Sequence, residues 1–561
     1  MATLDDLLAE IAAAPTGPET LAIFDFDGTL IAGYSATALL REQVRRGHLS
    51  PAQVAEVVAA MATFTLGNTG FSALMTVAAK FLKGMPVSEY EEVGRDLYQK
   101  HLARRIYPES RTLVKAHLAR GHTVAIISSA TPYQVEPAAH DLGIEHVICT
   151  QLEVEDGVFT GAVIRPTCFG QGKVDAARKL AGIVGGDLTD AWFYSDSTDD
   201  LELLEEVGHP HALNPSDELQ RLAQQRSWPA ARFGSRGLPS VGQVVRSMAA
   251  TSSMVGSFLA GLPIYALTGS RRDSINFAIS TFADTASALI GMRLQVRGAE
   301  HLWSARPCVF IFNHQSKADV IILAHLLRRD FASVGKQEIK TESPIVGRVM
   351  EYAGVVFIDR SNTRAAIRSV NALVEVMHKE GKSVVMAPEG TRTVSPTLAR
   401  FKKGAFHVAL QAKVPVVPIV IHNAGDVAPK GEFVYRPATV KVDVLPPVDT
   451  SGWSRHTIDE HVREVRNMYA AALGQPLEPA AAQSAKEAEA EAPASAPRKR
   501  AATGKARAKP GAANAAAKPR AAKKKAARKP AAPTGKPAAA AKTRAKARPK
   551  ARPKAQAGDS R

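Results

Sequence analysis

The sequence predicts two successive α/β domains followed by a disordered basic tail. Residues 15–245 and 293–475 each alternate short apolar runs of strand type with segments of helical pattern, which is the order of elements in parallel, doubly wound sheets. Residues 246–292 form a hydrophobic segment between the two domains. From residue 476 the chain is rich in Ala, Pro and Glu and then in Lys and Arg, a composition that cannot bury a core.

Three apolar runs in the first domain read as strands, and each ends in polar residues: LAIFDF (21–26), TVAIIS (123–128) and AWFYSD (191–196). Segments of helical pattern lie between them. Roughly eighty residues separate the first run from the next repeat of this pattern, which is too long for a loop. We therefore expect residues 31–110 to form a helical cap inserted into the domain.

The first of these strands delivers two carboxylates, Asp25 and Asp27. Alternation along a strand points both side chains to the same side. Oxygen ligands at the end of a strand suit a hard cation such as Mg²⁺, and one carboxylate can act as nucleophile while the other transfers protons. Taken alone, the pair also fits a polar strand end without catalytic function.

Three further elements favour a catalytic site. Ser128 ends the second strand and Lys173 precedes a helical pattern. The stretch YSDSTDD supplies Asp196 and Asp200 after another apolar run. In open α/β sheets, sites form outside the carboxyl ends of the strands. A hydroxyl donor, a cation and acidic metal ligands at that edge predict a site for phosphoryl transfer.

This order of motifs over residues 20–225 resembles the haloacid-dehalogenase (HAD) superfamily of hydrolases, in its phosphoserine-phosphatase-like branch. The resemblance implies a Rossmann-like fold, with Asp25 as the nucleophile that forms an aspartyl-phosphate. Asp27 would protonate the leaving group and then activate water. The resemblance also implies Ser128 and Lys173 as phosphoryl-binding residues and Mg²⁺ as cofactor, held by Asp25, Asp27 and Asp196 with Asp200 in support.

One position departs from that branch. Phosphoserine phosphatases carry a Glu seven residues after the second Asp, where it meets the amino group of the substrate, and this chain has Tyr34 there. The YSDSTDD stretch also differs from the usual Gly-Asp-Gly pattern. The resemblance therefore implies phosphatase chemistry but does not carry phosphoserine specificity over to this chain.

The segment between the domains admits two interpretations. Residues 247–269 contain no charged residue and are flanked by Arg246 and by Arg271–Arg272, and residues 275–292 carry only one acid. This length suffices for a membrane span of about 20 residues, and the basic flanks favour a membrane-embedded or interfacial hairpin. Because Ser, Thr, Gly and Pro dilute the apolar character, a pair of buried or linker helices is the alternative.

The second domain places a histidine directly after an expected strand. The strands expected here are PCVFIFN, GVVFIDR, KSVVMAPEG and PVVPIVI. His314 follows the first of them, and Asp319 stands five residues later at the start of a helix. A carboxylate can orient an imidazole and stabilise its protonated form, so that the imidazole deprotonates a hydroxyl. No G-x-S-x-G nucleophile elbow is present, so we expect that hydroxyl to belong to the substrate.

Several cationic elements in the same domain are suited to binding an anion. The strand KSVVMA ends in the stretch Pro388–Arg392, in which Gly lets the backbone approach an anion, Thr gives donors and Arg supplies a bidentate fork. The FKKG stretch (401–404) adds positive charge, and Arg360 ends another strand. Each piece alone could be a solvated loop, but together with the His/Asp pair they predict a site for an anionic substrate.

The four blocks NHQSKAD, GVVFIDR, PEGTR and VPVVPI, within residues 293–445, resemble the glycerolipid acyltransferase family, and within it the 1-acyl-sn-glycerol-3-phosphate acyltransferases. The resemblance implies that His314 is the general base on the free hydroxyl of lysophosphatidic acid and that Asp319 orients it. That hydroxyl would attack the thioester of acyl-CoA or acyl-carrier protein directly. The block Val414–Ile419 would line the acyl path. The resemblance assigns the acceptor and its phosphate to Arg360, Glu389, Gly390, Thr391 and Arg392.

The charge of the chain is concentrated at its end. The formal charge of the whole chain is +17, but residues 498–561 carry 22 Lys and Arg against the single acid Asp559, so the rest of the chain has a charge of −4. The Lys-Ala-Pro repeats of this tail resemble linker-histone tails. Such a tail binds nucleic acid or an anionic membrane surface through its charge alone.

The sequence therefore predicts a bifunctional enzyme of phospholipid biosynthesis, an acyltransferase fused to a Mg²⁺-dependent phosphatase. The alternatives are an acyltransferase with a regulatory HAD domain and a nucleic-acid-binding protein driven by its tail. Three scattered cysteines and the absence of a secretory signal from residues 1–14 predict a reducing, cytoplasmic setting. We expect the enzyme at the cytoplasmic face of the membrane, associated with it or anchored by a short span.

Overall fold

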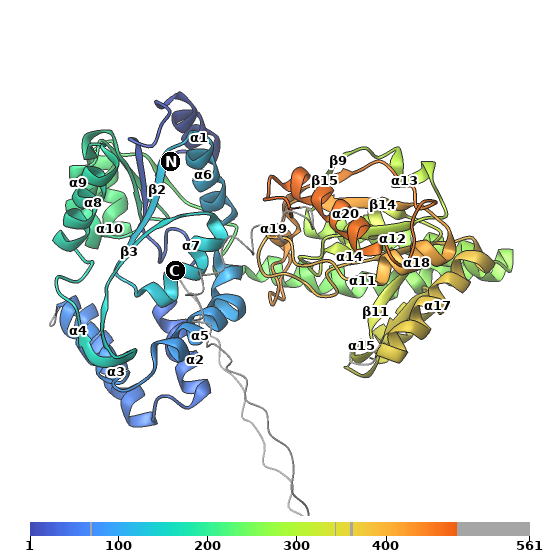
Figure 1. The fold of residues 1–561 in the computed structure, drawn as a ribbon, viewed down its shortest axis with the longest axis horizontal. Coiled ribbons are helices and arrows are strands. Elements are labelled where there is room, and N and C mark those ends of the chain that lie inside the picture. The colour runs from blue at the N-terminus through green and yellow to red at the C-terminus, as the bar shows by residue number, and fades with distance from the viewer. Residues whose placement is uncertain (68–69, 343, 359–362, 480–561) are drawn as a thin grey trace, which may run out of the picture. The chain divides into compact units, whose positions relative to one another are not determined.

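The computed structural model describes residues 1–67, 70–342, 344–358 and 363–479. These residues form two α/β parts, each built on its own sheet (Figure 1). The predicted fold class, a Rossmann-like domain with a helical cap followed by a second α/β domain, is confirmed. The predicted basic tail lies outside the described residues from position 480 onward.

A six-stranded sheet is the centre of the first part. Its strand order is β3-β2-β1-β6-β7-β8, and every neighbouring pair is parallel. The three runs expected to be strands form three neighbouring interior strands, β2, β1 and β6, because the middle of such a sheet is apolar on both faces. The strands are β1 (Leu21–Phe24), β2 (Thr123–Ser128), β3 (His146–Cys149), β6 (Trp192–Ser195), β7 (His209–Leu213) and β8 (Ala230–Ala231).

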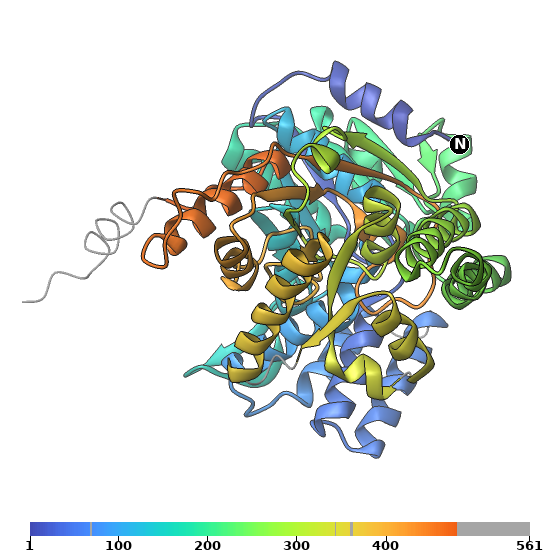
Figure 2. The same cartoon turned by 90° about the vertical axis from the view of Figure 1, so that its right-hand side faces the viewer.

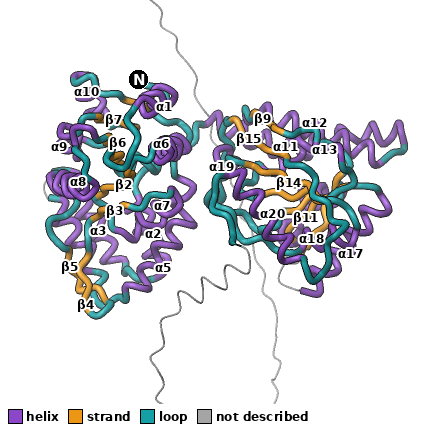
Figure 3. Tube along the Cα trace, turned by 45° about the horizontal axis from the view of Figure 1, so that its top comes forward, coloured by secondary structure: helices purple, strands orange, loops and turns teal. Residues whose placement is uncertain are grey.

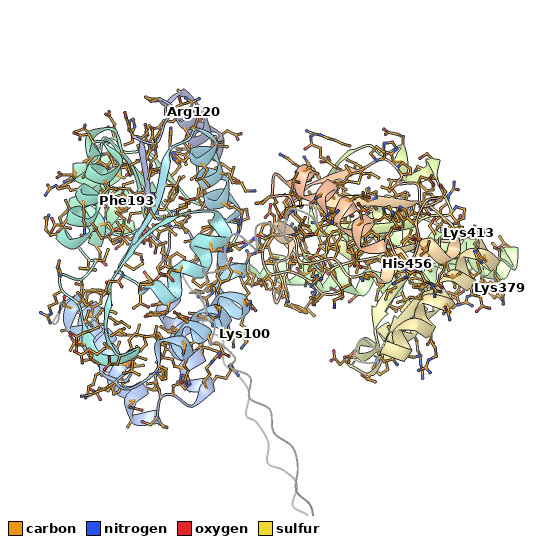
Figure 4. All side chains as sticks on the ribbon, in the orientation of Figure 1. Lys100, Arg120, Phe193, Lys379, Lys413 and His456 are labelled. Carbon is orange, nitrogen blue, oxygen red and sulfur yellow. The ribbon has the colours of Figure 1, made fainter. Side chains whose placement is uncertain are left out.

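Helices cover both faces of this sheet, as Figures 1 and 3 show. One face packs against α1 (Leu4–Ala13), α6 (Pro108–Ala119) and α7 (Pro132–Leu142). The other packs against α8 (Gln171–Val184), α9 (Leu201–Glu206) and α10 (Asp217–Gln225). Large side chains of the strands fill these interfaces, and Phe193 on β6 is completely buried (Figure 4). The loops that leave the carboxyl ends of the strands are therefore carried on a buried apolar core.

The cap is made of helices, as expected, with one addition. Its helices are α2 (Ser35–Arg46), α3 (Pro51–Thr65), α4 (Phe71–Lys80) and α5 (Val87–Leu97), followed by the short turns Tyr98–Leu102 and Ala103–Arg105. A hairpin of β4 (Leu152–Glu155) and β5 (Val158–Val163) from much later in the chain joins them. Phe159 of this hairpin packs on Tyr90 and Val93 of α5.

Two buried histidines, His117 and His122, lie beside the first sheet. His117 on α6 shares one hydrogen bond with the Tyr194 hydroxyl at 2.9 Å and another with His122 Nδ1 at 2.9 Å. Burial lowers the pKa of His117 from its usual 6.5 to about 3. The folded protein therefore keeps this imidazole neutral at a pH at which the unfolded chain would protonate it.

We expect this histidine to make the first part sensitive to acid. Its stabilising contribution is complete above pH 6.5 and falls by roughly 1 kcal/mol per pH unit as the pH drops from 6.5 toward 3, since only the unfolded chain takes up the proton. His117→Gln should therefore show a shallower loss of thermal midpoint between pH 7 and 4.5 than the wild type. Tryptophan fluorescence follows the unfolding, because Trp192 lies beside His117. Equal pH slopes for the two proteins would contradict the assignment.

The hydrophobic segment forms two long helices, α11 (Val241–Thr268) and α12 (Arg271–Ile290), which lie side by side (Figure 2). The sequence marks both ends. Ser240 and Gln243 form a capping box at the start of α11, and Gly269, at φ +68°, ends it in the left-handed conformation that glycine adopts without strain. Ser270 then caps α12 by accepting a hydrogen bond from the Asp273 amide.

The second part is built on a seven-stranded sheet of order β12-β11-β13-β10-β14-β15-β9. All neighbours are parallel except β14 and β15. The strands are β9 (Arg293–Arg297), β10 (Val309–Phe312), β11 (Phe331–Lys336), β12 (Val355–Ile358), β13 (Ser383–Met386), β14 (Val416–Ile421) and β15 (Thr439–Val444). Each of the four apolar runs expected from the sequence contributes one of these strands.

The helices of the second part also form two layers. On one face of the sheet, α11 and α12 pack with α14 (Asp319–Leu327). On the other lie α17 (Thr363–Glu380), α18 (Gly404–Ala412) and α20 (Ile458–Leu473). Shorter helices complete this part: α13 (His301–Ser304), α15 (Gln337–Glu342), α16 (Pro344–Tyr352) and α19 (Ala424–Val427). The sequence offered two interpretations of residues 246–292, a membrane hairpin and buried helices. In the structure, much of α12 is part of the core of the second part.

Candidate active sites

The first candidate site lies where β1 ends. The Asp25 amide donates to the Tyr194 carbonyl at 2.9 Å, which continues the pairing of β1 with β6. The Asp25 carboxylate is buried and receives a hydrogen bond from Lys173 Nζ at 2.7 Å. Lys173 stands in the first turn of α8 and also pairs with Asp200 at 2.6 Å. Three of the residues predicted from separate motifs are therefore in direct contact.

Both oxygens of Asp200 have partners. One pairs with Lys173, and the other accepts a hydrogen bond from Ser195 Oγ at 2.7 Å. Ser128 stands at the end of β2, next to β1, and is buried, with its Oγ accepting a hydrogen bond from the Ala130 amide at 3.3 Å. Asp200 thus fixes Lys173, and Ser128 lies at the same edge of the sheet.

Asp27 is held by Ser35, the first residue of α2 in the cap. The Ser35 amide donates to one carboxylate oxygen at 2.7 Å and the Ser35 hydroxyl to the other at 2.9 Å. Gln134 on α7 in turn donates to the Ser35 hydroxyl at 2.8 Å. Burial, helped by the charge of Asp25, raises the pKa of Asp27 to about 7. A carboxyl group of this kind can carry a proton near neutral pH and release it, as general acid–base chemistry requires.

Sequence reasoning did not identify Ser35. It is one of several serines in the chain, and only the fold brings it onto Asp27 across eight residues. The start of the cap and the acid–base candidate are therefore one hydrogen-bonded unit, which links the position of α2 to the geometry of the site.

The carboxylates at this edge fit a divalent cation. Burial raises the pKa of Asp25 to about 6 and that of Asp196 well above its usual value, and neighbouring carboxylates add to both shifts. Gly28, at φ +78°, lies so close to the Asp196 carboxylate that a Cβ would overlap it. Lys173 is the one ammonium group paired with this cluster in the described residues. The negative charge is thus incompletely balanced, as expected for oxygen ligands that await a hard cation.

The side chains alone do not form a closed metal cage. Within the described ranges no group of three His, Cys, Asp or Glu side chains is arranged to hold a metal. The side-chain oxygens of Asp27 are occupied by Ser35, which leaves its backbone carbonyl, and Asp200 is occupied by Lys173 and Ser195. A cation would therefore meet Asp25, Asp196 and one carbonyl, together with water and substrate, which is the kind of set that Mg²⁺ accepts.

The second candidate site begins directly after β10. His314 Nδ1 and Asp319 Oδ2 are 2.7 Å apart. The same carboxylate oxygen accepts the amides of Gln315 and Ser316 at 3.0 Å each, and Asp319 is completely buried. The His314 side chain is 24% exposed. The structure therefore forms the predicted pair, with a fixed acid behind a histidine that remains accessible.

The PEGTR loop approaches His314 from the end of β13. The Glu389 carboxylate accepts the His314 amide at 2.9 Å and the Ala399 amide at 3.4 Å, and burial raises its pKa to about 7. The Thr393 amide donates to the His314 carbonyl at 2.9 Å. The sequence predicted that Glu389 holds the acceptor substrate. The structure instead buries its carboxylate behind His314, where it accepts hydrogen bonds from the His314 and Ala399 amides. Its contacts position the His314 backbone.

The rest of this loop remains accessible. Gly390 has φ +73°, Thr391 is exposed and Arg392 is half-buried. Arg360 lies outside the described residues, so its predicted role stays a prediction.

Two lysines complete the second site. Lys402, from the FKKG stretch, lies over Gly390, where a Cβ would be 3.0 Å from its ammonium. Lys317 places its ammonium 4.0 Å from the centre of the Tyr435 ring and donates to the Phe433 carbonyl. The basic FKKG stretch (401–404) indicated positive charge at this position. The sequence did not show which of its two lysines faces the PEGTR loop.

An apolar cavity of about 590 Å³ opens at His314. Its walls come from α11, α12, α14 and the ends of β11 and β13, and include Met254, Phe258, Phe282, Phe331 and Met386. Lys317, Gly390 and Lys402 line it beside His314. The block 414–419, expected on the acyl path, does not line this cavity; its residues from 416 onward are buried in β14.

Comparisons with known proteins divide the chain in the same way. Residues 22–205 match the model of the haloacid dehalogenase-like hydrolases. Residues 293–422 match the acyltransferase model. A 1-acyl-sn-glycerol-3-phosphate acyltransferase of Limnanthes alba is 34% identical over 191 residues, which cover 34% of this chain and 67% of that protein. The human alpha form is 35% identical over 179 residues, which cover 32% of this chain and 63% of the human protein.

A further relative has a name of a different kind. The "Inhibition of morphological differentiation protein" of Streptomyces azureus is 33% identical over 220 residues, covering 38% of this chain and 79% of that protein. Among solved structures, the LPA acyltransferase PlsC of Thermotoga maritima matches with 24% identity and a TM-score of 0.34, covering 40% of this chain and 92% of that one. Residues 22–205 thus match the haloacid dehalogenase-like hydrolase model, and through its second α/β part the chain belongs to the 1-acyl-sn-glycerol-3-phosphate acyltransferases.

Proposed function

We propose that the chain is a bifunctional enzyme of phospholipid biosynthesis. Its second domain acylates 1-acyl-sn-glycerol-3-phosphate (lysophosphatidic acid) to phosphatidic acid, and its first hydrolyses a phosphomonoester. The observation that carries the proposal is the His314–Asp319 pair, 2.7 Å apart, at the mouth of an apolar cavity of about 590 Å³. This volume is within the range of pockets that enclose small molecules, and its apolar walls suit an acyl chain.

In the acyl transfer, His314 acts as the general base. Asp319 engages Nδ1, which leaves Nε2 to take the proton from the free hydroxyl of the acceptor. The hydroxyl oxygen attacks the thioester carbon of acyl-CoA or acyl-carrier protein. The tetrahedral intermediate then expels the thiolate, which takes up the proton. The buried negative charge of Asp319 stabilises the imidazolium while it holds that proton.

The acceptor phosphate binds at the PEGTR loop. Gly390 allows close approach of the backbone, and Thr391 and Arg392 supply donors. Lys402 adds a cation at the same place, since its ammonium lies over Gly390, and Arg360 is proposed to join them. Neither Arg392 nor Lys402 forms an ion pair with an acid in the part of the chain that the structure describes, which leaves their charge available for an anion.

In the hydrolysis, the Asp25 carboxylate attacks phosphorus while Asp27 protonates the leaving oxygen. Water, deprotonated by Asp27, then cleaves the aspartyl-phosphate. Lys173 and Ser128 bind the oxygens of the phosphoryl group. Mg²⁺, on which hydrolases of this fold generally depend, would be held by Asp25, Asp196 and the Asp27 carbonyl, and would neutralise charge on the phosphoryl group when bound.

We also propose that α11 lies at a membrane. It is the single helix among the described residues that is long and apolar enough to cross one, and only 17% of its apolar window is buried. Leu259, Leu262, Tyr265 and Leu267 are about half or more exposed. These side chains lie toward the end of the helix, whereas Met254 and Phe258 line the cavity. A lipid acceptor could then enter the cavity from the membrane interface, and the basic tail would bind anionic head groups or nucleic acid.

Product analysis tests the proposal. The full-length protein is given lysophosphatidic acid with acyl-CoA or acyl-carrier protein, with Mg²⁺ or with EDTA, and the lipids are identified by mass spectrometry. We expect phosphatidic acid in both metal conditions, and release of phosphate from p-nitrophenyl phosphate only with Mg²⁺. No phosphatidic acid with either donor would overturn the acyl-transfer half. Equal phosphate release in EDTA would overturn the metal-dependent hydrolysis, and diacylglycerol would indicate that the two reactions are coupled.

A further inference from the structure

A lysine stands inside the block that carries the catalytic pair of the second domain. Lys317 lies between His314 and Asp319, in the loop that joins β10 to α14, and its side chain lines the apolar cavity beside His314. Within the described ranges it forms no ion pair with an acid. An ammonium group is costly to place in an apolar wall unless other groups stabilise its charge, so its remaining contacts must supply that stabilisation.

These contacts all come from one segment, residues 428–438, which joins α19 to β15 and which we call the strap. Lys317 Nζ donates a hydrogen bond to the Phe433 carbonyl. It also lies 4.0 Å from the centre of the Tyr435 ring and 5.1 Å from the centre of the Phe433 ring. A cation is attracted to the face of an aromatic ring, and more strongly where water is excluded. The lysine therefore binds the strap through its positive charge.

The strap forms part of the cavity wall between α11 and the loop of His314. Tyr435 lines the cavity together with Thr251 and Met254 of α11. On the α11 side, the Tyr435 amide donates to Ser247 Oγ at 2.8 Å. On the side of the catalytic loop, Lys317 contacts the Tyr435 ring. Tyr435 is thus held from both sides, and the lysine provides the hold on the side of the histidine.

The rest of the strap is anchored without the lysine. The Ser316 hydroxyl donates to the Ala428 carbonyl at 2.6 Å, and the Arg436 amide donates to the Val427 carbonyl at 2.8 Å. Val434, between the two aromatic residues, is buried. Loss of the lysine charge should therefore release the Tyr435 ring while the strap stays folded.

The charge of Lys317 changes close to neutral pH. Burial lowers the pKa of its ammonium from the usual 10.5 to about 8, Glu432 of the strap opposes this shift, and Arg392 adds to it. Burial also raises the pKa of the Tyr435 phenol, which keeps this ring neutral in the same range. The other titratable groups on the cavity are His314, Asp319 and Lys402. The positive charge is thus present at pH 7 and is lost as the pH rises through about 8.

We propose that Lys317 is a positioning residue for the lipid acceptor. Its ammonium holds Tyr435 in place as the cavity wall beside His314, and the lysine thereby determines how tightly the acceptor is bound. The acceptor is the substrate concerned because the strap contacts α11, along which the lipid is proposed to enter. This role rests on the proposed acyl transfer, in which the proton still passes to His314 alone.

Steady-state kinetics on the full-length protein test this role, with lysophosphatidic acid and acyl-CoA or acyl-carrier protein varied in turn. Lys317→Met keeps a long apolar side chain but removes the charge. At pH 7 we expect its KM for lysophosphatidic acid to rise roughly tenfold, while kcat stays within about twofold and the KM for the donor does not change. Lys317→Arg should keep most of the affinity, since a guanidinium also binds over aromatic rings.

The pH dependence separates this role from a merely structural one. In the wild type, the KM for lysophosphatidic acid should rise between pH 7 and 9.5 toward that of Lys317→Met, because the ammonium loses its proton near pH 8. Lys317→Arg should show no such rise relative to Lys317→Met, because a guanidinium keeps its charge. Ionisation of the substrate phosphate affects all three proteins equally and cancels in these ratios.

Variants of Tyr435 assign the effect to its ring. Tyr435→Leu should raise the KM as Lys317→Met does, whereas Tyr435→Phe keeps the ring and should not. Because the two residues act as one unit, the double variant Lys317→Met/Tyr435→Leu should be no worse than either single variant. The matched control is Lys379→Met, since Lys379 is 73% exposed on α17 and pairs with Glu375 of the same helix (Figure 4). It should behave as the wild type does.

Several results would count against the role. An unchanged KM in Lys317→Met at pH 7 would overturn it. A fall in kcat of roughly 10²-fold with an unchanged KM would overturn it too, because the lysine would then act on the reacting atoms. If Lys317→Met does not fold, the wild type and Lys317→Arg decide, and an equal pH dependence of their KM values excludes the role. If the wild type forms no phosphatidic acid, the proposed acyl transfer itself fails, and the role of the lysine falls with it.

Discussion

Asp25→Asn is expected to lower phosphate release from p-nitrophenyl phosphate by at least about 10³-fold, because the amide cannot act as the attacking oxygen. The substitution keeps the shape of the side chain. Lys173 retains its second partner, Asp200, at 2.6 Å, so the local hydrogen bonding changes little. Acyl transfer by the other domain should stay at the wild-type rate.

The same variant should be at least as stable as the wild type. Burial raises the pKa of Asp25 to about 6, so its carboxylate is ionised at neutral pH at a cost in free energy. A neutral amide avoids that cost. Calorimetry should therefore give a thermal midpoint equal to or above that of the wild type, and a matched surface variant, Asp190→Asn, should change neither property. Retained turnover would remove Asp25 from the nucleophile role, and lost turnover together with a collapsed midpoint would point to misfolding.

The sequence predicted the strand ends better than the loops. LAIFDF, TVAIIS and the run before Asp196 are apolar enough to be central strands, and parallel strands necessarily bring their carboxyl ends to one edge. Asp25, Lys173 and Asp200 therefore meet as predicted. The position of a residue at a strand end follows from pattern and topology, both of which can be read along the chain.

The contacts of loop side chains could not be predicted in this way. Glu389 turns inward to accept two amides, which depends on where the chain places the His314 and Ala399 amides. The β4–β5 hairpin begins at Leu152 and joins a cap that ends at Arg105, more than forty residues earlier in the chain. The basic flanks of 246–292 favoured a membrane hairpin, but its hydrophobic pattern also fits a core helix, because both bury apolar side chains. Only the packing shows that α12 faces the sheet while much of α11 remains exposed.

His314→Ala is expected to lower acyl transfer by at least about 10³-fold, since no other group takes the proton from the acceptor hydroxyl. Hydrolysis of p-nitrophenyl phosphate by the first domain should not change, so the same protein preparation contains an internal control for correct folding. His456→Ala removes an exposed histidine of the same part (Figure 4) and should leave acyl transfer intact. Near-normal transfer by His314→Ala, measured as phosphatidic acid formed per minute, would exclude the general-base role.

Asp319→Asn tests how the carboxylate acts on His314. Its Oδ2 accepts two amides and His314 Nδ1, while Oδ1 is buried without a partner. The two amides should hold the Asn oxygen in the Oδ2 position, so that the imidazole keeps its orientation and only the negative charge is lost. We expect a fall of about 10²–10³-fold in acyl transfer. Because both residues serve one proton transfer, the double variant should be no slower than His314→Ala alone, and multiplied effects would mean that Asp319 contributes independently of the histidine.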